Sequence, residues 1–163
     1  FPLAGLYAFF LVWMQIMLGS NLDWIRGRAS WLYAFHKFEG GIALLFALIH
    51  PTLLALGLGI AEYYKYGFVA PGKILFIWIG YLQLFLLICT AGTALLRRVE
   101  WLRSRWFLVH QLNYLIFILV WLHSWNLGSD VQATNLRYVW IFMGITAVLS
   151  GGRKWVYKYR TAS

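Results

Sequence analysis

Five long apolar runs, separated by short polar stretches, constrain the fold of this chain more than any other feature. A helix that crosses a bilayer needs about 20 mostly apolar residues, and each run is long enough or nearly so. None shows the strict alternation of apolar and polar residues that barrel strands require. We therefore predict an all-α, polytopic transmembrane bundle in one domain (1–163), with helices over residues 3–20, 30–59, 73–96, 104–125 and 136–156.

The composition excludes several classes of protein. Of the 163 residues, 62% are apolar and only 12% are charged. A water-soluble globule of this size has too much surface to hide so many apolar side chains. A soluble enzyme, a disordered tail and a nucleic-acid-binding module are therefore excluded, and lipid is the expected surrounding. The single cysteine, Cys89, excludes an intrachain disulfide and a Cys-rich metal site.

The basic residues predict how the helices are oriented. Lys and Arg collect in cytoplasmic segments of membrane proteins. Only Lys65, Lys73 and Arg137 lie in the segments after the second and fourth runs. This asymmetry predicts a multi-pass protein of the plasma (cytoplasmic) membrane, with runs 30–59 and 104–125 pointing outward and a cytoplasmic C-terminus. The segments after the first, third and fifth runs hold the other basic residues that mark the cytoplasmic side: Arg26, Arg28, Arg97, Arg98, Arg103, Arg105, Arg153, Lys154, Lys158 and Arg160.

All four histidines fall on the second and fourth runs, as His36 and His50 and then His110 and His123. Ionisable residues inside a membrane are costly and indicate function. The spacings of 14 and 13 residues separate the members of each run by about 21 Å and 19.5 Å along a helix. Because the two runs are predicted to be parallel, His36 pairs with His110 on the inner side and His50 with His123 on the outer side.

Two imidazoles at each depth favour haem over a bare metal ion. Zinc takes three or four protein ligands, whereas a porphyrin supplies four nitrogens and needs only two axial ligands. We therefore predict two stacked haems b, held by His36/His110 and His50/His123. Such bis-histidine haems have no open coordination position and suit electron transfer. A spacing of 13 residues turns the second histidine by about 140°, so run 104–125 is either distorted, for example by a π-bulge, or meets the two haems from different sides.

Four basic residues are candidate partners for the haem propionates: Lys37, Arg103 and Arg105 on the inner side and Arg137 on the outer side. Each is also explained as an interfacial residue whose charged end reaches water. Glu39 lies one turn from His36, and we expect it to pair with Lys37 or a loop arginine, or to form a hydrogen bond near the inner haem.

The second run resembles a known helix. Its segments Phe35-His36-Lys37, Ile42-Ala43-Leu44 and Ala47-Leu48-Ile49-His50 are similar to the third transmembrane helix of NADPH oxidases and ferric reductases. That family is similar in having a His-x13-His helix and a His-x12-His helix with one helix between them. The resemblance implies six helices, the first of which is absent from this sequence, and a cytoplasmic domain beyond residue 163 that binds FAD and NAD(P)H. The start at Phe1-Pro2-Leu3 agrees with a piece of a longer protein.

The resemblance also implies an activity. A reduced flavin, fed by NAD(P)H, would deliver single electrons to the inner haem, and the outer haem would pass them to a small acceptor. That acceptor would be dioxygen, giving superoxide, or a chelated ferric ion. The chain would then be part of a membrane oxidoreductase of the NAD(P)H oxidase or ferric reductase type. Leu54 stands where oxygen-reducing oxidases carry another histidine, and run 3–20 has no arginine, so an oxygen site is not carried over.

Other classes stay open. The cytochrome b561-type proteins spread four ligands over four helices, and the methionine-sulfoxide-repair haem proteins match these spacings less well. A haem-containing membrane subunit fed by quinol or by a separate flavoprotein uses the same histidines without a fused dehydrogenase. A non-redox transporter bundle with histidine sites is the alternative from another class, and an absorption spectrum distinguishes it.

Overall fold

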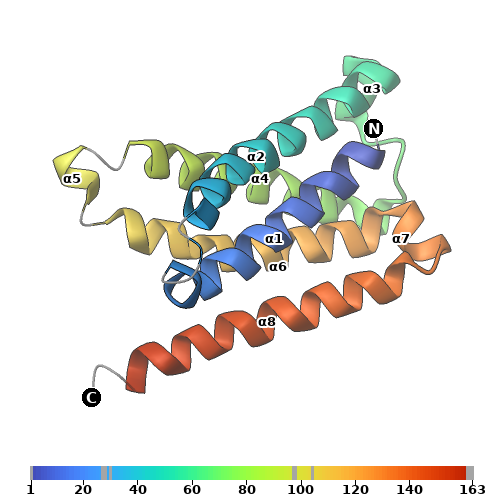
Figure 1. The fold of residues 1–163 in the computed structure, drawn as a ribbon. Helices are drawn as coiled ribbons and strands as arrows, with labels where there is room; N and C mark the ends of the chain where they lie inside the picture. The colour runs from blue at the N-terminus through green and yellow to red at the C-terminus, as the bar shows by residue number, and fades with distance from the viewer. Residues whose placement is uncertain (1, 27–28, 30, 97–98, 104, 161–163) are drawn as a thin grey trace.

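The computed structural model describes residues 2–26, 29, 31–96, 99–103 and 105–160 (Figure 1). Of the described residues 91% are helical and none lies in a strand, which confirms the predicted all-α class. Four short helical segments connect the long ones: α3 (Ile60–Lys65), η1 (Pro71–Lys73), α5 (Glu100–Arg103) and α7 (Ser129–Ala133). The five predicted runs correspond to the long helices α1 (Pro2–Arg26), α2 (Trp31–Leu58), α4 (Ile74–Leu95), α6 (Trp106–Leu127) and α8 (Leu136–Arg160).

Four of these helices are long and apolar enough to cross a membrane. Their candidate membrane spans are residues 2–22, 31–58, 71–95 and 108–127. The fifth, α8, is one of the predicted helices and has sufficient length. It carries Arg137, Arg153 and Lys154, and it falls outside this group of apolar helices in the described chain. The prediction of a polytopic membrane bundle is thus supported by four helices, and α8 is the less apolar member.

The helices are arranged as two pairs with α8 alongside. α1 packs against α2 and α4 packs against α6, while α8 contacts α1 and α6. In Figure 1 α2 and α6 run in one direction and α1, α4 and α8 run in the other. The C-terminal ends of α1, α4 and α8, together with α5, therefore share one end of the bundle, and α3 and α7 lie at the opposite end.

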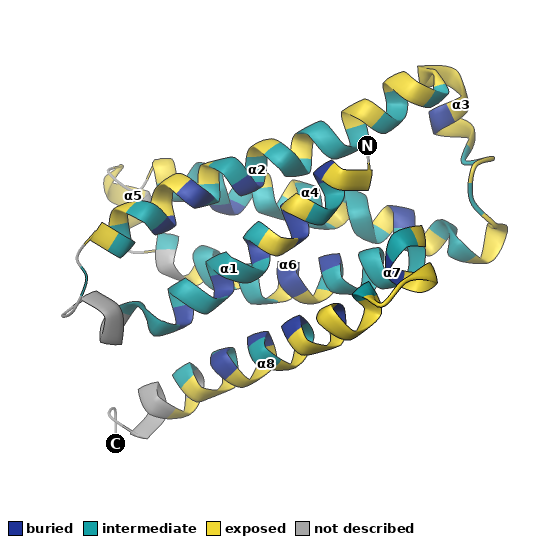
Figure 2. Ribbon diagram, turned by 45° about the vertical axis from the view of Figure 1, so that its right-hand side comes forward, coloured by how far each residue is buried: buried dark blue, intermediate teal, exposed yellow. Residues whose placement is uncertain are grey.

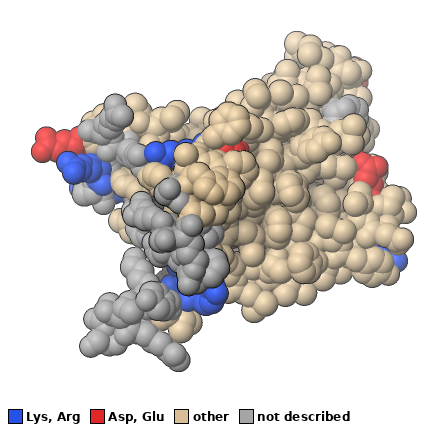
Figure 3. Space-filling view, in the orientation of Figure 1, with Lys and Arg blue, Asp and Glu red and all other residues tan. Residues whose placement is uncertain are grey.

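The segments predicted to be cytoplasmic thus lie together at one end. Most of the Lys and Arg side chains visible in Figure 3 are at that end. Arg28, Arg97 and Arg98 lie outside the described residues, as do the side chains of Arg26, Lys158 and Arg160. We refer to this end as the inner end and to the end with α3 and α7 as the outer end.

Aromatic stacking fastens α8 to the bundle. Phe9 of α1 is only 1% exposed, and its ring stacks on Trp140 of α8 at 4.4 Å and on Phe117 of α6 at 5.6 Å between centroids. Trp13 donates a 3.0 Å hydrogen bond to the hydroxyl of Thr146. The buried turns of α8 lie on its side toward α1 and α6 (Figure 2), so α8 is a packed member of the bundle.

We expect Phe9→Ala to destabilise the protein by about 3 kcal/mol, because it leaves a cavity where three helices meet. Helix association in lipid depends on close packing of this kind. The midpoint of thermal unfolding in detergent measures the effect. Phe85→Ala is the matched control, since the Phe85 side chain of α4 is 62% exposed at the surface of the bundle. Equal midpoints for the two variants would contradict the assigned role of Phe9.

Candidate functional site

The inner histidines lie next to each other between α2 and α6. The ring centroids of His36 and His110 are 6.3 Å apart, and the ring planes are at 89°. His36 is among the few buried polar residues of the described chain. A metal ion bound to one nitrogen of each ring, with bonds of about 2 Å, would set the two ring centres roughly 6 Å apart. The observed separation fits a shared metal.

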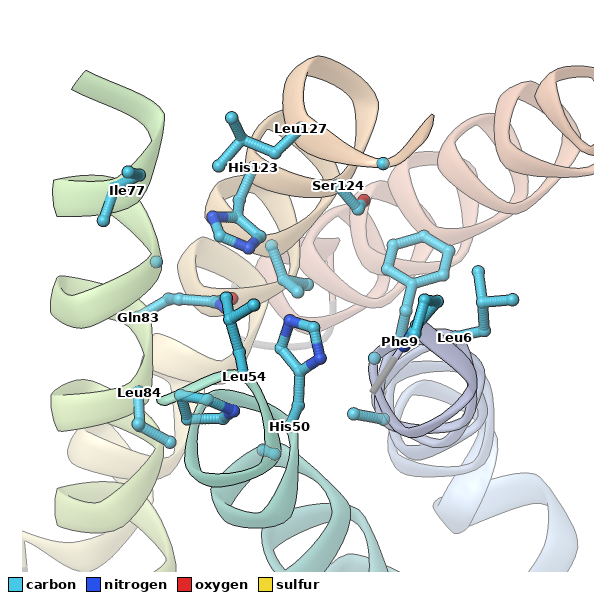
Figure 4. A pocket seen from close by; sticks show the side chains of 18 of the residues that line it. Leu6, Phe9, His50, Leu54, Ile77, Gln83, Leu84, His123, Ser124 and Leu127 are labelled. Atoms are coloured by element: carbon cyan, nitrogen blue, oxygen red, sulfur yellow. The ribbon is translucent and has the colours of Figure 1, made fainter. Parts of the chain in front are cut away.

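The outer histidines face a common cavity of about 400 Å³. His50 projects into it from α2 and His123 from α6, and Gln83 of α4 points into the same space (Figure 4). The volume is within the range of ligand-binding cavities. Leu54, the residue in the position of the extra histidine of the oxidases, also lines the cavity. Other apolar side chains complete the wall, among them Leu6, Phe9, Ile77, Leu84, Ile116 and Leu127.

Glycines on neighbouring helices make room for three of the four imidazoles. A Cβ atom on Gly80 of α4 would lie 2.6 Å from the His123 ring, and one on Gly5 of α1 would lie 2.9 Å from the His50 ring. A Cβ on Gly19 would lie 3.5 Å from the His36 ring. The first two distances are shorter than atoms tolerate, so the outer rings occupy space that any other residue would fill.

A backbone carbonyl fixes the proton on His123. Its Nδ1 lies 2.7 Å from the carbonyl oxygen of Phe76 on α4. Because a carbonyl only accepts, Nδ1 is the donor and Nε2 keeps its lone pair. This arrangement is typical of metal-bound histidine, whose second nitrogen is commonly bonded to an outer partner.

A chain of side-chain hydrogen bonds also holds His110, but here the amide N–H of Asn113 is the donor and Nδ1 of His110 is the acceptor. The Asn113 amide nitrogen lies 3.2 Å from Nδ1 of His110 and donates to the His110 carbonyl oxygen at 2.8 Å. Asn113 in turn accepts a 3.1 Å hydrogen bond from the hydroxyl of Thr90, which is 1% exposed on α4. Helix α4 therefore contributes a polar contact at both depths.

The predicted distortion of the fourth run is wrong. α6 is an unbroken α-helix from Trp106 to Leu127, without a π-bulge. The two histidines of α6 have different neighbours. His110 faces His36 on α2, whereas His123 packs on Gly80 and Phe76 of α4. The other predicted possibility, in which the two haems meet the helix from different sides, stays a prediction.

The four basic residues predicted as counter-charges are all exposed. The ammonium of Lys37 lies 4.4 Å from the Tyr33 ring centre, and the guanidinium of Arg105 lies 5.1 Å from the Trp101 ring centre. Arg137 contacts Tyr138, and Arg103 ends α5. Arg137, the outer candidate, does not line the outer cavity, and the role of all four as partners of haem propionates stays a prediction.

Lys154 of α8 was predicted only as one of the basic residues that mark the cytoplasmic side. Its ammonium donates a 2.7 Å hydrogen bond to the carbonyl oxygen of Gly19, the residue that packs against His36. No spacing rule connects α8 with the histidine helices, so only the packing of α8 on α1 reveals this position.

Glu39 was expected near Lys37, a loop arginine or the inner haem. The structure instead shows Gln15 of α1 donating to Oε2 of Glu39 and, at 2.6 Å, to the carbonyl oxygen of His36. Glu39 is 1% exposed. A pairing of Glu39 with Lys37 is not seen, since Lys37 points outward to Tyr33.

The fold and the site define a multi-pass helical membrane protein with two pairs of facing histidines at two depths. The donor set suits a porphyrin-bound metal, because each depth supplies two imidazoles on different helices. The mostly apolar cavity that both outer rings face fits a flat apolar group, and Gly5 and Gly80 leave room for the two rings themselves. A conventional metal cluster is not present in the described chain, which holds no group of three or more His, Cys, Asp or Glu.

Comparison with known proteins gives the class a closer relative. The chain is 30% identical over 152 residues to the protein-methionine-sulfoxide reductase haem-binding subunit MsrQ of Xanthomonas campestris pathovar campestris, in strain 8004 and in strain ATCC 33913. The match covers 93% of this chain and 66% of each relative, so the chain spans just under two thirds of their length. No protein-family model matches the sequence, and no solved structure matches it.

These relatives change the order of the earlier alternatives. The histidine spacings match the NADPH oxidases and ferric reductases better than the methionine-sulfoxide-repair haem proteins. Both curated relatives are haem-binding subunits of a methionine-sulfoxide reductase. The chain is therefore similar to a haem-binding membrane subunit, and the comparisons do not support the oxidase or ferric reductase type in particular.

Proposed function

We propose that this chain is a haem-binding, electron-transferring portion of a membrane oxidoreductase, fed by a partner. The observation that carries the proposal is the pairing of His36 with His110 and the facing of His50 and His123 across one apolar cavity. The curated relatives, which are named as haem-binding subunits, support the same class. Bound haem with two imidazole ligands would supply single-electron transfer without binding a substrate at the metal.

Each residue of the site has a defined task in this proposal. His36 and His110 hold the inner haem, and His50 and His123 hold the outer one. The Phe76 carbonyl keeps the proton of His123 on Nδ1, so Nε2 faces the cavity as a ligand. Leu54 and its apolar neighbours form most of the wall of the outer site, and such a wall would lower the polarity around a redox centre.

The direction of transfer follows from the charge asymmetry. We place the inner end, with α5 and the C-terminus, in the cytoplasm because the basic segments meet there. Electrons then enter near His36 and leave near His50. Since the relatives are named as subunits of a reductase that acts on methionine sulfoxide in proteins, we propose a catalytic partner protein at the outer end as the acceptor.

A second candidate differs in donor and acceptor. The His-x13-His and His-x12-His spacings motivate an oxidase or ferric reductase with a fused FAD and NAD(P)H domain beyond residue 163, reducing dioxygen or chelated ferric iron. Leu54 lies beside His50 in the cavity, so the outer site offers no additional polar residue at that position. We therefore favour the partner-fed subunit.

A haem count with absorption spectra tests the proposal. We expect the chain, expressed with ample haem and purified in detergent, to contain two low-spin haems b that dithionite reduces completely. A single haem would contradict the two-level assignment, and colourless but folded protein would favour a non-redox histidine bundle. The electron donor is tested on the full-length protein. Reduction by a separate flavoprotein, but not by NAD(P)H alone, would support a partner-fed subunit over a fused dehydrogenase.

A further inference from the structure

Two buried polar atoms on one face of α2 are left without a hydrogen bond. They are Nδ1 of His36 and Oε1 of Glu39, and the hydroxyl of Tyr81 is the other such side-chain atom in the described chain. His36 and Glu39 are three residues apart, so their side chains leave the same face of the helix, with Cβ atoms about 5–6 Å apart. Tyr81 belongs to α4 and lines the outer cavity, so Glu39 is the residue of this group that shares a helix face with His36.

The carboxylate is held in place from the other side. Gln15 of α1 donates one hydrogen bond to Oε2 of Glu39 and a second one, of 2.6 Å, to the carbonyl oxygen of His36. A Cβ on Gly40 would lie 3.2 Å from the Gln15 amide, so glycine at this position leaves room for Gln15. The brace thus fixes Glu39 beside the residue whose ring nitrogen lacks a partner.

The burial of Glu39 requires a second partner. The side chain is 1% exposed inside an apolar helix, and a carboxyl group there is costly unless its oxygens are bonded. Gln15 satisfies Oε2 only. Oε1 needs a proton donor, and Nδ1 of His36 carries a proton whenever Nε2 binds a metal.

The other histidines differ in how Nδ1 is satisfied. Nδ1 of His123 donates to the Phe76 carbonyl, whereas Nδ1 of His110 accepts from the Asn113 amide N–H. Metal-bound histidines commonly donate their second N–H to a carboxylate, a carbonyl or a water. His36 lacks such a contact in the described chain, and Glu39 supplies the missing type.

Building on the proposed function, we propose that Glu39 is the positioning residue of the inner ligand His36. His36 donates from Nδ1 to Oε1 of Glu39, directly or through one buried water, and Nε2 is left as the metal ligand. The negative charge makes the imidazole a stronger electron donor. Glu39 therefore stabilises the oxidised inner site and lowers its reduction potential.

Redox titration of the purified, haem-loaded chain tests this role. We expect Glu39→Gln to shift the reduction equilibrium of one of the two waves about tenfold toward the reduced form, about 59 mV for one electron. The shifted wave must be the one that His36→Ala abolishes. Glu39→Leu, which removes the acceptor, lowers occupancy of that site by about 10–100-fold. Glu62→Gln is the matched control, because Glu62 is exposed and paired with Lys65 at the outer end.

Two further measurements separate this proposal from the proposed function. ¹⁵N resonances of the His36 ring in haem-free protein report the protonated nitrogen, and we expect Nδ1–H in the wild type and a mixture in Glu39→Leu. Gln15→Leu, which leaves Glu39 in place, should move the same wave in the same direction by less. Unchanged waves and tautomers in these variants would overturn the role of Glu39, while a wild type without haem would overturn the proposed function alone.

Discussion

Replacing His123 by alanine is expected to remove one haem and leave the other in place. His123 lies at the outer cavity with His50, whereas His36 and His110 form a separate pair. The haem content should fall from about two per chain to about one, because the outer site then keeps only one of the two imidazoles that would hold its haem. Pyridine haemochrome assay and the reduced-minus-oxidised spectrum measure this loss.

The inner pair provides the reciprocal control. His110→Ala should remove the complementary spectral component and retain the one that His123→Ala removes. The two difference spectra should add up to that of the wild type. Identical losses from both variants would show that the histidines are paired across the two depths in a different way, and loss of both haems from each variant would show that the sites are not independent.

Replacing Gly80 by alanine is expected to damage the outer site nearly as much, although Gly80 cannot bind a metal. The new Cβ would lie 2.6 Å from Cε1 and Nδ1 of His123. The ring must move, and it then loses the 2.7 Å hydrogen bond to the Phe76 carbonyl. We expect haem affinity at this site to fall by about 10–100-fold, as for loss of an outer partner of a ligand, measured by titrating haem into the purified protein.

Gly92 on the same helix gives a matched control. A Cβ there meets nothing within 4 Å, so Gly92→Ala should leave both haems in place and stabilise α4 by up to about 1 kcal/mol. If Gly80→Ala binds two haems with unchanged spectra, the packing of His123 against α4 is not important for ligand geometry.

The sequence was sufficient for the helices and for the two depths of the histidines. Apolar runs of bilayer length define helices by hydropathy alone, and the bounds of α2 and α6 differ from those expected by only a few residues. The pairing of His36 with His110 followed from the parallel direction of those helices. In the structure these rings are 6.3 Å apart.

The neighbours of the histidines could not be predicted in the same way. Gly5, Gly80 and Phe76 act through positions on other helices, and no spacing within one helix reports them. The rotation of about 140° between His110 and His123 left two alternatives open, a distorted helix or two sites on different sides, because the sequence does not show where α4 packs against α6. Lys154 was counted as a topology signal for the same reason.

The family assignment shows a related limit. Spacing of ligands along two helices is shared by proteins with different donors and acceptors, since it follows from the depth of the bilayer. The similarity to haem-binding subunits of methionine-sulfoxide reductase extends over 152 residues, most of which do not contact the histidines. Function at this level depends on surfaces that the ligand spacing does not encode.

Because α6 is an unbroken helix, the number of residues between His110 and His123 determines how these two histidines are oriented relative to each other. His110 and His123 are separated by about 19.5 Å of continuous backbone rise, and no bulge can absorb an extra residue. A single insertion in the segment 111–122 would turn His123 by about 100°, away from Phe76 and Gly80. Exchanges of lipid-facing residues such as Leu115 and Ile118, which are exposed, would leave the register intact, so natural variation in this segment should consist of substitutions without gaps.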